Sequence, residues 1–308
     1  MAVISHISPE ADTLGSALAA YLVLRKMGKE VALFNADPIP RRYRFLPGAE
    51  EIVHCDRILR PFEIYLVVDS SDRERAGGLL QDLPSQSLVI NIDHHPSNEG
   101  FGDLNWVEAG ASSTGEMVFR LFKEMGVPIP PEAATNLYAA ILIDTGSFRF
   151  SNTTPSALRA AAELIELGAD PQEIAHQLYD HQDPRSLRLL GKVLSEMAVS
   201  QDGAVAHIVI RRADLEAAGI GMDETEEFIN YPRSLKGVKV ALAFKEMAKG
   251  VIKVSFRSRG PVDVAQIASL FQGGGHKNAA GCTILGSLEE AIERVLTEVK
   301  GALNGSSF

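Results

Sequence analysis

The sequence has little cysteine, no long apolar run and no surplus of positive charge. Its two cysteines, Cys55 and Cys282, lie far apart, which excludes a disulfide framework and a thiolate zinc site and fits a reducing compartment. The longest apolar stretches, at 64–68 and 139–143, are far shorter than the roughly 20 residues that cross a bilayer. No secretory signal precedes the first strand-like segment, so we expect a cytoplasmic protein without a membrane span.

Acidic residues outnumber basic ones, 40 to 30, and the formal net charge is −10. Proteins that bind long nucleic acids non-specifically rely on basic surfaces. The charge therefore argues against a long duplex as the ligand and is easier to reconcile with a short or small phosphorylated molecule. With 308 residues, of which 45% are hydrophobic and 23% charged, the chain has the composition of a globular protein, and we expect two domains.

The first half of the chain alternates short β-branched runs with helical patterns. Strands are predicted at 3–5, 31–34, 64–68 and 88–92. Helices are predicted at 15–27, 113–125, 132–143, 155–167 and 171–178. This rhythm is typical of an α/β fold with a mostly parallel sheet flanked by helices.

The remainder predicts a smaller α+β domain. A helix beginning at Pro184 precedes strands at 204–210, 238–244 and 251–256 and helical patterns at 263–270 and 288–303. We therefore divide the chain into a catalytic domain at 1–183, a connecting helix at 184–200 and a second domain at 201–308. The last residues, 304–308, are expected to form a disordered tail.

Four apolar runs end abruptly in acidic or histidine side chains. His6 follows the first run, with Glu10 and Asp12 just beyond it, and Asp69 follows the run at 64–68. The other two runs end in the triplet 93–95 and in Asp144. A single Asp in such a place is more often a helix cap or turn former. The carboxyl ends of parallel strands share one crevice, however, so we expect at least the first three groups to converge at that edge of the sheet.

A convergent cluster of carboxylates and imidazoles predicts bound metal ions. Carboxylates packed closely repel one another and take up protons unless cations neutralise them. Oxygen-rich sites with a few imidazoles suit hard or borderline ions. We therefore expect two Mn²⁺ ions, with Mg²⁺ as the alternative.

Four segments, in the same order along the chain, resemble the motifs of the DHH phosphoesterases. They are HISPEADTLGS at 6–16, VVDSSD at 67–72, DHH at 93–95 and IDTGSF at 143–148. The segment GGGHKNAAG at 273–281 is similar to the glycine-rich motif of the DHH-associated domain. The resemblance covers nearly the whole chain and is greatest to the nanoRNase and oligoribonuclease group, which also removes the 3′-phosphate of phosphoadenosine phosphate.

The resemblance implies a role for each motif residue. His6, Glu10 and Asp69 would bind one metal ion, and the second would be bound by Asp12, Asp69, His94 and Asp144. His95 would face the scissile phosphate, and Asp93 would orient a metal-binding imidazole rather than bind metal itself. Glu10 stands where the family pattern has Asp, which puts the first ion's site in doubt. Relatives also commonly have a helix before the first strand, so a truncated start is another reading.

A second set of residues is expected to bind the substrate. Three consecutive glycines, Gly273, Gly274 and Gly275, leave backbone N–H groups open to a phosphate, although the block could equally be a flexible turn. Other candidates are His276, Ser255, Arg257, Ser258 and Arg149. Arg257 has a competing explanation as a surface ion-pair partner, and Arg149 could instead hold the turn after Asp144.

These observations predict a metal-dependent phosphoesterase that acts on short single-stranded RNA or on a nucleotide bisphosphate. Because separate residues would hold the two ends of the substrate, short molecules should be preferred. Two rivals remain: a nucleotide-binding regulator with an impaired metal site, and an inorganic pyrophosphatase of the same superfamily. For the oligomeric state we also consider a homodimer.

Overall fold

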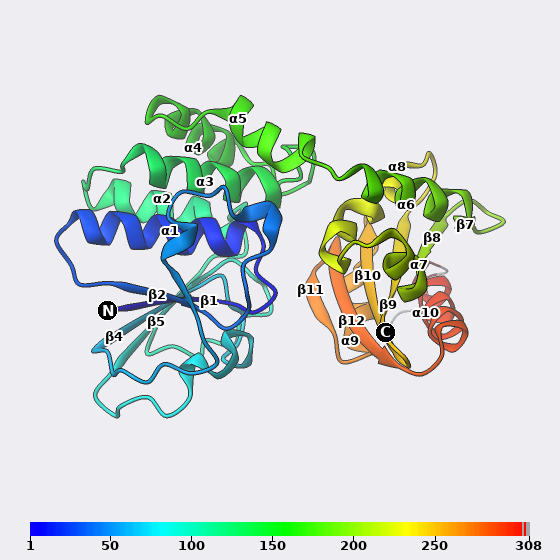
Figure 1. Ribbon diagram of the computed structural model, residues 1–308, viewed down its shortest axis with the longest axis horizontal. Helices are drawn as coiled ribbons and strands as arrows, with labels where there is room; N and C mark the ends of the chain where they lie inside the picture. Colours follow the sequence, from blue (N-terminus) through cyan, green and yellow to red (C-terminus); the bar gives the residue numbers. More distant parts are fainter. Residues whose placement is uncertain (304, 306–308) are drawn as a thin grey trace. The chain divides into compact units, whose positions relative to one another are not determined.

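The computed structural model describes residues 1–303 and 305 of the chain (Figure 1). The chain divides into two compact units, Met1–His181 and Gln182–Phe308. The tail expected at 304–308 lies outside the described residues, apart from Gly305. Among the helices of the described part, none is long and apolar enough to cross a membrane.

The N-terminal unit is built on a six-stranded sheet with the order β3-β2-β1-β4-β5-β6, in which every neighbouring pair is parallel. Its strands are β1 (Ala2–Ser5), β2 (Ala32–Asn35), β3 (Ile52–His54), β4 (Ile64–Val68), β5 (Leu88–Asp93) and β6 (Leu104–Val107). The predicted α/β class with a mostly parallel sheet is confirmed. The edge strands β3 and β6 were not predicted, because they are short and largely exposed and therefore lack an apolar run.

Helices cover one face of this sheet, as Figure 1 shows. They are α1 (Ala11–Lys26), α2 (Thr114–Glu124), α3 (Pro131–Asp144) and α4 (Pro155–Glu166), followed by α5 (Pro171–Ala175) and a π-helical turn at His176–Asp180. Their buried side chains pack on Val3, Leu33 and Leu66 of the sheet. The opposite face is covered by Phe62 and by a 3-10 segment, η3 (Glu74–Leu80).

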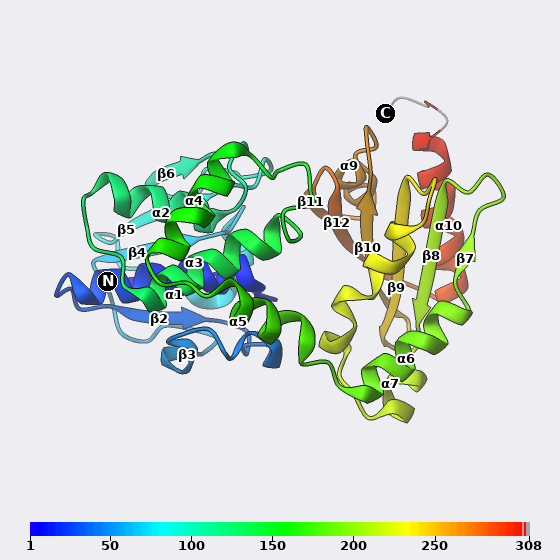
Figure 2. The ribbon, with the colours of Figure 1, turned by 90° about the horizontal axis from the view of Figure 1, so that it is seen from above.

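The C-terminal unit contains a second six-stranded sheet, with the order β11-β12-β10-β9-β8-β7 (Figure 2). Its strands are β7 (Ala198–Val199), β8 (Val205–Ile210), β9 (Val240–Ala248), β10 (Val251–Ser258), β11 (Gly274–His276) and β12 (Ala279–Leu285). Strands β8 and β9 are parallel and the other neighbouring pairs antiparallel. The predicted smaller α+β unit is therefore confirmed.

Helical segments cover both faces of the second sheet. α9 (Val264–Ser269) and α10 (Leu288–Leu303) pack on one face around Phe244 and Phe256. On the other face lie α6 (Pro184–Ser195), α7 (Arg212–Ala218), the 3-10 segment η5 (Met222–Ile229) and α8 (Asn230–Ser234). The helix expected between the domains is α6, and its Leu189, Leu190 and Val193 belong to the core of the second unit.

Close packing of α1 against α3 explains the glycine of the first motif. A Cβ atom added to Gly15 would lie 2.4 Å from the backbone oxygen of Asn136 on α3. Both helices carry side chains of the metal centre described below, so this contact fixes their separation. Only glycine permits that distance without a shift of the backbone.

We predict that Gly15→Ala destabilises the N-terminal unit by about 1–3 kcal/mol, because the added methyl overpacks the α1–α3 contact. Thermal unfolding followed by calorimetry measures the effect. Gly191→Ala in α6 is the matched control, since a Cβ there meets no atom within 4 Å. That control should be neutral or stabilising by up to about 1 kcal/mol. Equal melting of the Gly15→Ala and wild-type N-terminal units would contradict the packing argument.

Candidate metal centre

The acidic and histidine groups of the first three motifs meet at the carboxyl ends of β1, β4 and β5. His6 follows β1, Asp69 follows β4, and the triplet 93–95 begins on the last residue of β5. Strands β1 and β4 are neighbours although β2 and β3 lie between them in sequence, so this is the topological switch point where such sheets bind ligands. The predicted convergence is therefore present for His6, Asp69 and the triplet 93–95, whereas Glu10 of the first group is exposed at the start of α1.

Two helices bring further carboxylates to the same place. Asp12 lies in the first turn of α1. Asp144 is the last residue of α3, which agrees with the helix predicted at 132–143. The run before Asp144 is apolar because α3 is buried between other helices.

His94 is the common neighbour of these carboxylates. Its Nε2 lies 3.6 Å from Asp12 Oδ2, 3.6 Å from Asp144 Oδ2 and 3.8 Å from Asp69 Oδ1. Ligand atoms of Asp12, His94 and Asp144 all lie within 4.8 Å of one another. This oxygen-rich set with one imidazole fits a hard or borderline divalent cation.

The electrostatics of the buried groups also fit a cation. Asp12 and Asp69 are each 1% exposed. Burial, and then the charge of Asp69, raise the pKa of Asp12 well above its ordinary value. Burial opposes ionisation of Asp69 too, but the hydrogen bond and charge of His6 outweigh it and lower the pKa of Asp69. A divalent ion beside both carboxylates would favour the ionised form of each.

The residues predicted to bind the other ion lie less close together than Asp12, His94 and Asp144. Nε2 of His6 lies 3.3 Å from Asp69 Oδ2, and the Thr13 hydroxyl touches both groups, at 2.7 Å and 2.6 Å respectively. Glu10 is exposed at the start of α1 and makes no capping hydrogen bond there. Among the described residues it belongs to none of the acidic and imidazole groups spaced for one ion. The set His6, Glu10 and Asp69 stays a prediction.

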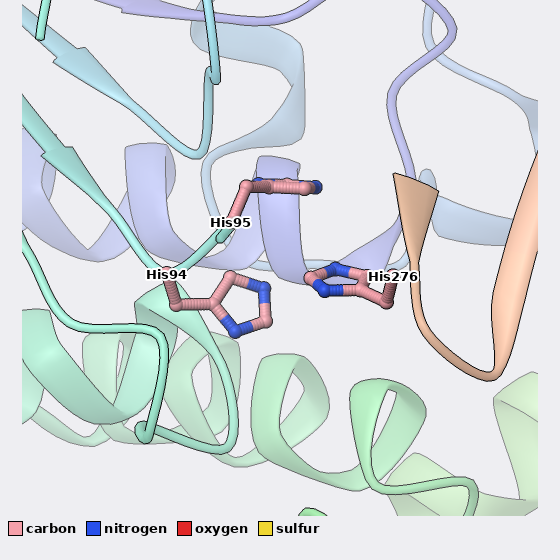
Figure 3. A group of neighbouring side chains, drawn as sticks. All are labelled: His94, His95 and His276. Carbon is pink, nitrogen blue, oxygen red and sulfur yellow. The ribbon is translucent and has the colours of Figure 1, made fainter. Parts of the chain in front are cut away.

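Asp93 and His95 form a buried pair beside the cluster. His95 Nδ1 lies 2.7 Å from Asp93 Oδ1, and Asn98 donates a hydrogen bond of 2.7 Å to the other oxygen of Asp93. Figure 3 shows the imidazoles of His94 and His95 leaving the chain just beyond β5. Asp93 therefore contacts the imidazole of His95, whereas a metal-binding imidazole was expected as its partner, and its role stays a prediction.

Several supporting residues were not predicted from the sequence. The backbone N–H groups of Thr114 and Gly115, at the N-terminus of α2, each donate a 2.8 Å hydrogen bond to Asp12. The Thr114 hydroxyl donates to Asp69 at 2.9 Å, and Ser16 donates to Asp12 at 3.0 Å. The sequence did contain a signal for this contact, because Ser113 and Glu116 have the spacing typical of a helix N-terminus. Helix N-termini bind anions such as the carboxylate of Asp12.

Backbone strain is concentrated in the loops that carry these groups. Four residues other than glycine have positive φ angles there: Ser8 at 52°, Asp69 at 59°, Ser147 at 59° and Phe148 at 60°. They lie in the loops that follow β1, β4 and α3. Such conformations cost about 1–3 kcal/mol each and are typically kept where function needs them.

The predicted substrate residues of the C-terminal unit divide between the two faces of its sheet. Ser255 on β10 pairs with Gly281 on β12, which in turn pairs with Gly274 on β11. In the same way Arg257 on β10 pairs with Ala279 on β12, which pairs with His276 on β11. Paired residues point to the same face, so these four predicted residues share one face. Figure 3 also draws His276, which ends β11.

Ser258 and two of the glycines have structural roles. Ser258 is buried, donates a hydrogen bond to the Val262 carbonyl and accepts one from Asn278. A Cβ atom on Gly273 or Gly275 would lie within 2.5 Å of β12 backbone oxygens, whereas at Gly274 it would meet nothing within 4 Å. Glycine at 273 and 275 is thus required by the close approach of β12, whereas Gly274 is not constrained in this way. Substrate contacts of Ser258, Gly273 and Gly275 stay predictions that this placement does not favour.

Arg149 is exposed and holds the turn after α3. Its Nε donates a 2.7 Å hydrogen bond to the Gly146 carbonyl. This hydrogen bond explains the position of Arg149 without requiring a bound ligand. Of the two readings that the sequence left open, the structural one has support, and the phosphate contact stays a prediction.

We predict that Asp144→Ala weakens binding of one Mn²⁺ ion by more than the ~10–100-fold typical of residues that only support ligands. Isothermal titration calorimetry on the metal-free protein measures the affinity. Glu10→Ala is the matched control, since that carboxylate lies outside the Asp12, His94 and Asp144 group. It should leave this ion bound as in the wild type. Unchanged Mn²⁺ affinity in Asp144→Ala would remove this residue from the centre.

Comparison with known proteins agrees with this geometry. Residues 1–141 match the DHH family, N-terminal domain, and residues 202–305 match the DHHA1 domain. The chain is 38% identical to the bifunctional oligoribonuclease and PAP phosphatase NrnA of Thermus thermophilus, covering 99% of this chain and 91% of that protein. It is 32% identical to NrnA of Bacillus subtilis, covering 96% and 92%.

A solved structure is similar over the whole length. The crystal structure of an exopolyphosphatase-related protein from Bacteroides fragilis matches with a TM-score of 0.88 and 28% identity, covering 99% of this chain and 93% of that one. Both domain matches, the order of the motifs and the placement of their acidic and histidine side chains therefore agree. The chain belongs to the DHH phosphoesterases that carry a DHHA1 domain.

Proposed function

We propose that this protein is a Mn²⁺-dependent phosphoesterase that hydrolyses short oligoribonucleotides to mononucleotides, removes the 3′-phosphate of phosphoadenosine phosphate, or does both. The observation that carries the proposal is the group of Asp12, His94 and Asp144, of which the first two are buried, with Asp69 beside it. The two substrates are those named for the NrnA relatives from Thermus thermophilus and Bacillus subtilis.

The chain's own residues supply the metal ligands in this account. Asp12, Asp69, His94 and Asp144 would hold one ion, and His6, Glu10 and Asp69 the other, with Mg²⁺ as the alternative metal. Two ions held in this way activate water at neutral pH and neutralise charge on the phosphate. The N-terminus of α2 keeps the carboxylate of Asp12 directed into the site through two backbone N–H groups.

His95 is assigned the transfer of a proton or hydrogen bond to the reacting phosphate. The 2.7 Å contact between its Nδ1 and Oδ1 of Asp93 fixes the ring. In its imidazolium form the ring would donate from Nε2 to a phosphoryl or leaving-group oxygen. Asp93 acts through His95 and is a positioning residue.

The C-terminal unit is assigned the second phosphate of the substrate. Ser255, Arg257, Gly274 and His276 share one face of its sheet, which offers a guanidinium, a hydroxyl, an imidazole and open backbone. Separate ligands for the scissile phosphate and for another phosphate of the same molecule favour short substrates. The net charge of −10 agrees with that preference.

One observation supports a second candidate function, that of a nucleotide-binding regulator. Glu10 replaces the Asp of the family pattern and is exposed at the start of α1. If its carboxylate cannot hold the first ion, nucleotide would bind without being hydrolysed. Replacement of Glu10 by Asp distinguishes the two candidates, because it restores the family's ligand set.

We predict that the purified protein with Mn²⁺ converts a 5′-labelled RNA trimer to mononucleotides and releases phosphate from phosphoadenosine phosphate. His95→Ala should lower kcat about 10²–10⁴-fold, the usual contribution of a general acid or base. Gel electrophoresis and phosphate release follow the two reactions. His181→Ala is the control, since His181 is exposed and outside the motifs.

Two other outcomes would contradict this function. Nucleotide binding without product, both in the wild type and in Glu10→Asp, would favour the regulator. Hydrolysis of inorganic pyrophosphate alone would favour a pyrophosphatase.

A further inference from the structure

Three cationic side chains share one face of the C-terminal sheet. Lys253 on β10 pairs directly with Lys245 on β9 and with Thr283 on β12. Arg257 lies four residues along β10 from Lys253, so its side chain points to the same face. This is also the face of Ser255, but neither lysine belongs to the motifs that the sequence singled out.

The face is half covered. Over β8 and β9 an apolar cluster that includes Ile208, Ala243 and Phe228 closes it. The half formed by β10, β12 and β11 carries polar and small residues, among them Lys253, Ser255 and Gly281. Segment η5 contacts both β9 and β10, so it lies at the border between the two halves.

Glu226 on η5 is the acidic group of this border. One of its carboxylate oxygens lies 2.9 Å from Nζ of Lys245, which is 1% exposed, whereas the Glu226 side chain is 44% exposed. Burial disfavours ionisation of Glu226, but Lys245, and then Lys253 and Arg257, outweigh it and lower the pKa of Glu226. The four charged groups therefore act on one another.

The balance of charge in this group is positive. Lys245, Lys253 and Arg257 carry three positive charges against the single negative charge of Glu226. Among the described residues, neither Lys253 nor Arg257 has a carboxylate oxygen within 4.0 Å. Their side chains are half-buried, so the charge is partly desolvated and attracts anions more strongly than it would at an open surface.

We propose that Lys253 and Arg257 form a phosphate subsite on the C-terminal unit, and that Glu226, held by the buried Lys245, is a built-in competitor for it. A phosphate group of a nucleotide would bind beside Lys253 and Arg257. The fixed negative charge of Glu226 weakens that binding and keeps it reversible. Lys245 is too deeply buried to touch the ligand and acts by positioning Glu226.

This subsite deepens the proposed function, because it adds Lys253 and Glu226 to the residues assigned to the substrate's second phosphate. A dianionic terminal phosphate suits a site with a net positive charge better than a singly charged internal phosphodiester. Mononucleotides, bisphosphates and short oligonucleotides ending in a phosphate are therefore the expected ligands.

Calorimetric titration of the full-length protein with AMP in metal-free buffer tests the subsite without hydrolysis. Without metal the carboxylate cluster of the N-terminal unit repels phosphate, so the C-terminal unit dominates the signal. Glu226→Gln should bind AMP about three- to tenfold more tightly, because one nearby negative charge is removed while an oxygen that can accept from Lys245 remains. Lys253→Ala should bind AMP more weakly by a similar factor, and Lys253→Arg should restore binding.

Glu224→Gln is the matched control, since it removes the same charge from the same segment and should leave AMP affinity unchanged. Adenosine, which lacks the phosphate, should bind equally to wild type and Glu226→Gln. Thermal unfolding checks that each variant is folded.

AMP affinity in Glu226→Gln that equals or falls below the wild-type value would overturn the proposal and leave Glu226 as an anchor of η5. Unchanged affinity in Lys253→Ala would also overturn it. Failure of the proposed function is distinguishable, since the protein would then bind AMP in the expected order yet hydrolyse neither RNA nor phosphoadenosine phosphate.

Discussion

Repulsion between buried carboxylates is the constraint around which the N-terminal unit is organised. Asp12 and Asp69 are almost fully buried, and Asp144 reaches the same histidine from another helix. Such crowding is tolerated only when cations or many donors compensate it. The structure supplies donors from α2, Thr13 and Ser16, and it places the imidazoles of His6, His94 and His95 close by. Together these features describe a site shaped for a divalent ion.

The scaffold serves the same requirement. Gly15 lets α1 approach α3 closely, and those helices carry Asp12 and Asp144. Residues with strained backbone angles lie in the loops that carry the acidic and histidine groups, and Asp69 is itself one of them. The free energy of a well-packed parallel sheet and its helices can sustain such local strain.

The C-terminal unit carries mainly cationic side chains on the face where we propose that phosphate binds. Lys245, Lys253 and Arg257 lie on that face of the sheet, with Glu226 opposing them. A protein with a net charge of −10 thus concentrates cationic groups where we propose that phosphate binds. Long polyanions gain little from so small a patch, whereas a single phosphate can be held by two or three side chains.

Much of this organisation could be predicted from the sequence. Buried parallel strands are continuous apolar runs, so β1, β4 and β5 and the acidic groups after them were found directly. The edge strands β3 and β6 were not predicted, because exposed strands lack such apolar runs. Asp144 was found by the same pattern, an apolar run that ends in a carboxylate, although its run belongs to the helix predicted at 132–143 and observed as α3.

Other features depend on contacts between segments that are distant in sequence. Thr114 and Gly115 bind Asp12 only because α2 begins beside α1. Lys245 and Glu226 form an ion pair only because η5 packs against β9 and β10 of the second sheet. Two of the three residues of the glycine block serve the pairing of β11 with β12, a packing role that the sequence could not show, and their substrate contacts stay predictions.

Anomalous diffraction at the manganese absorption edge from crystals soaked in Mn²⁺ tests the central claim most directly. The account predicts an anomalous peak bonded to oxygen atoms of Asp12, Asp69 and Asp144 and to Nε2 of His94. A fully soaked crystal with no peak among these side chains, or with the peak bound elsewhere, would contradict it.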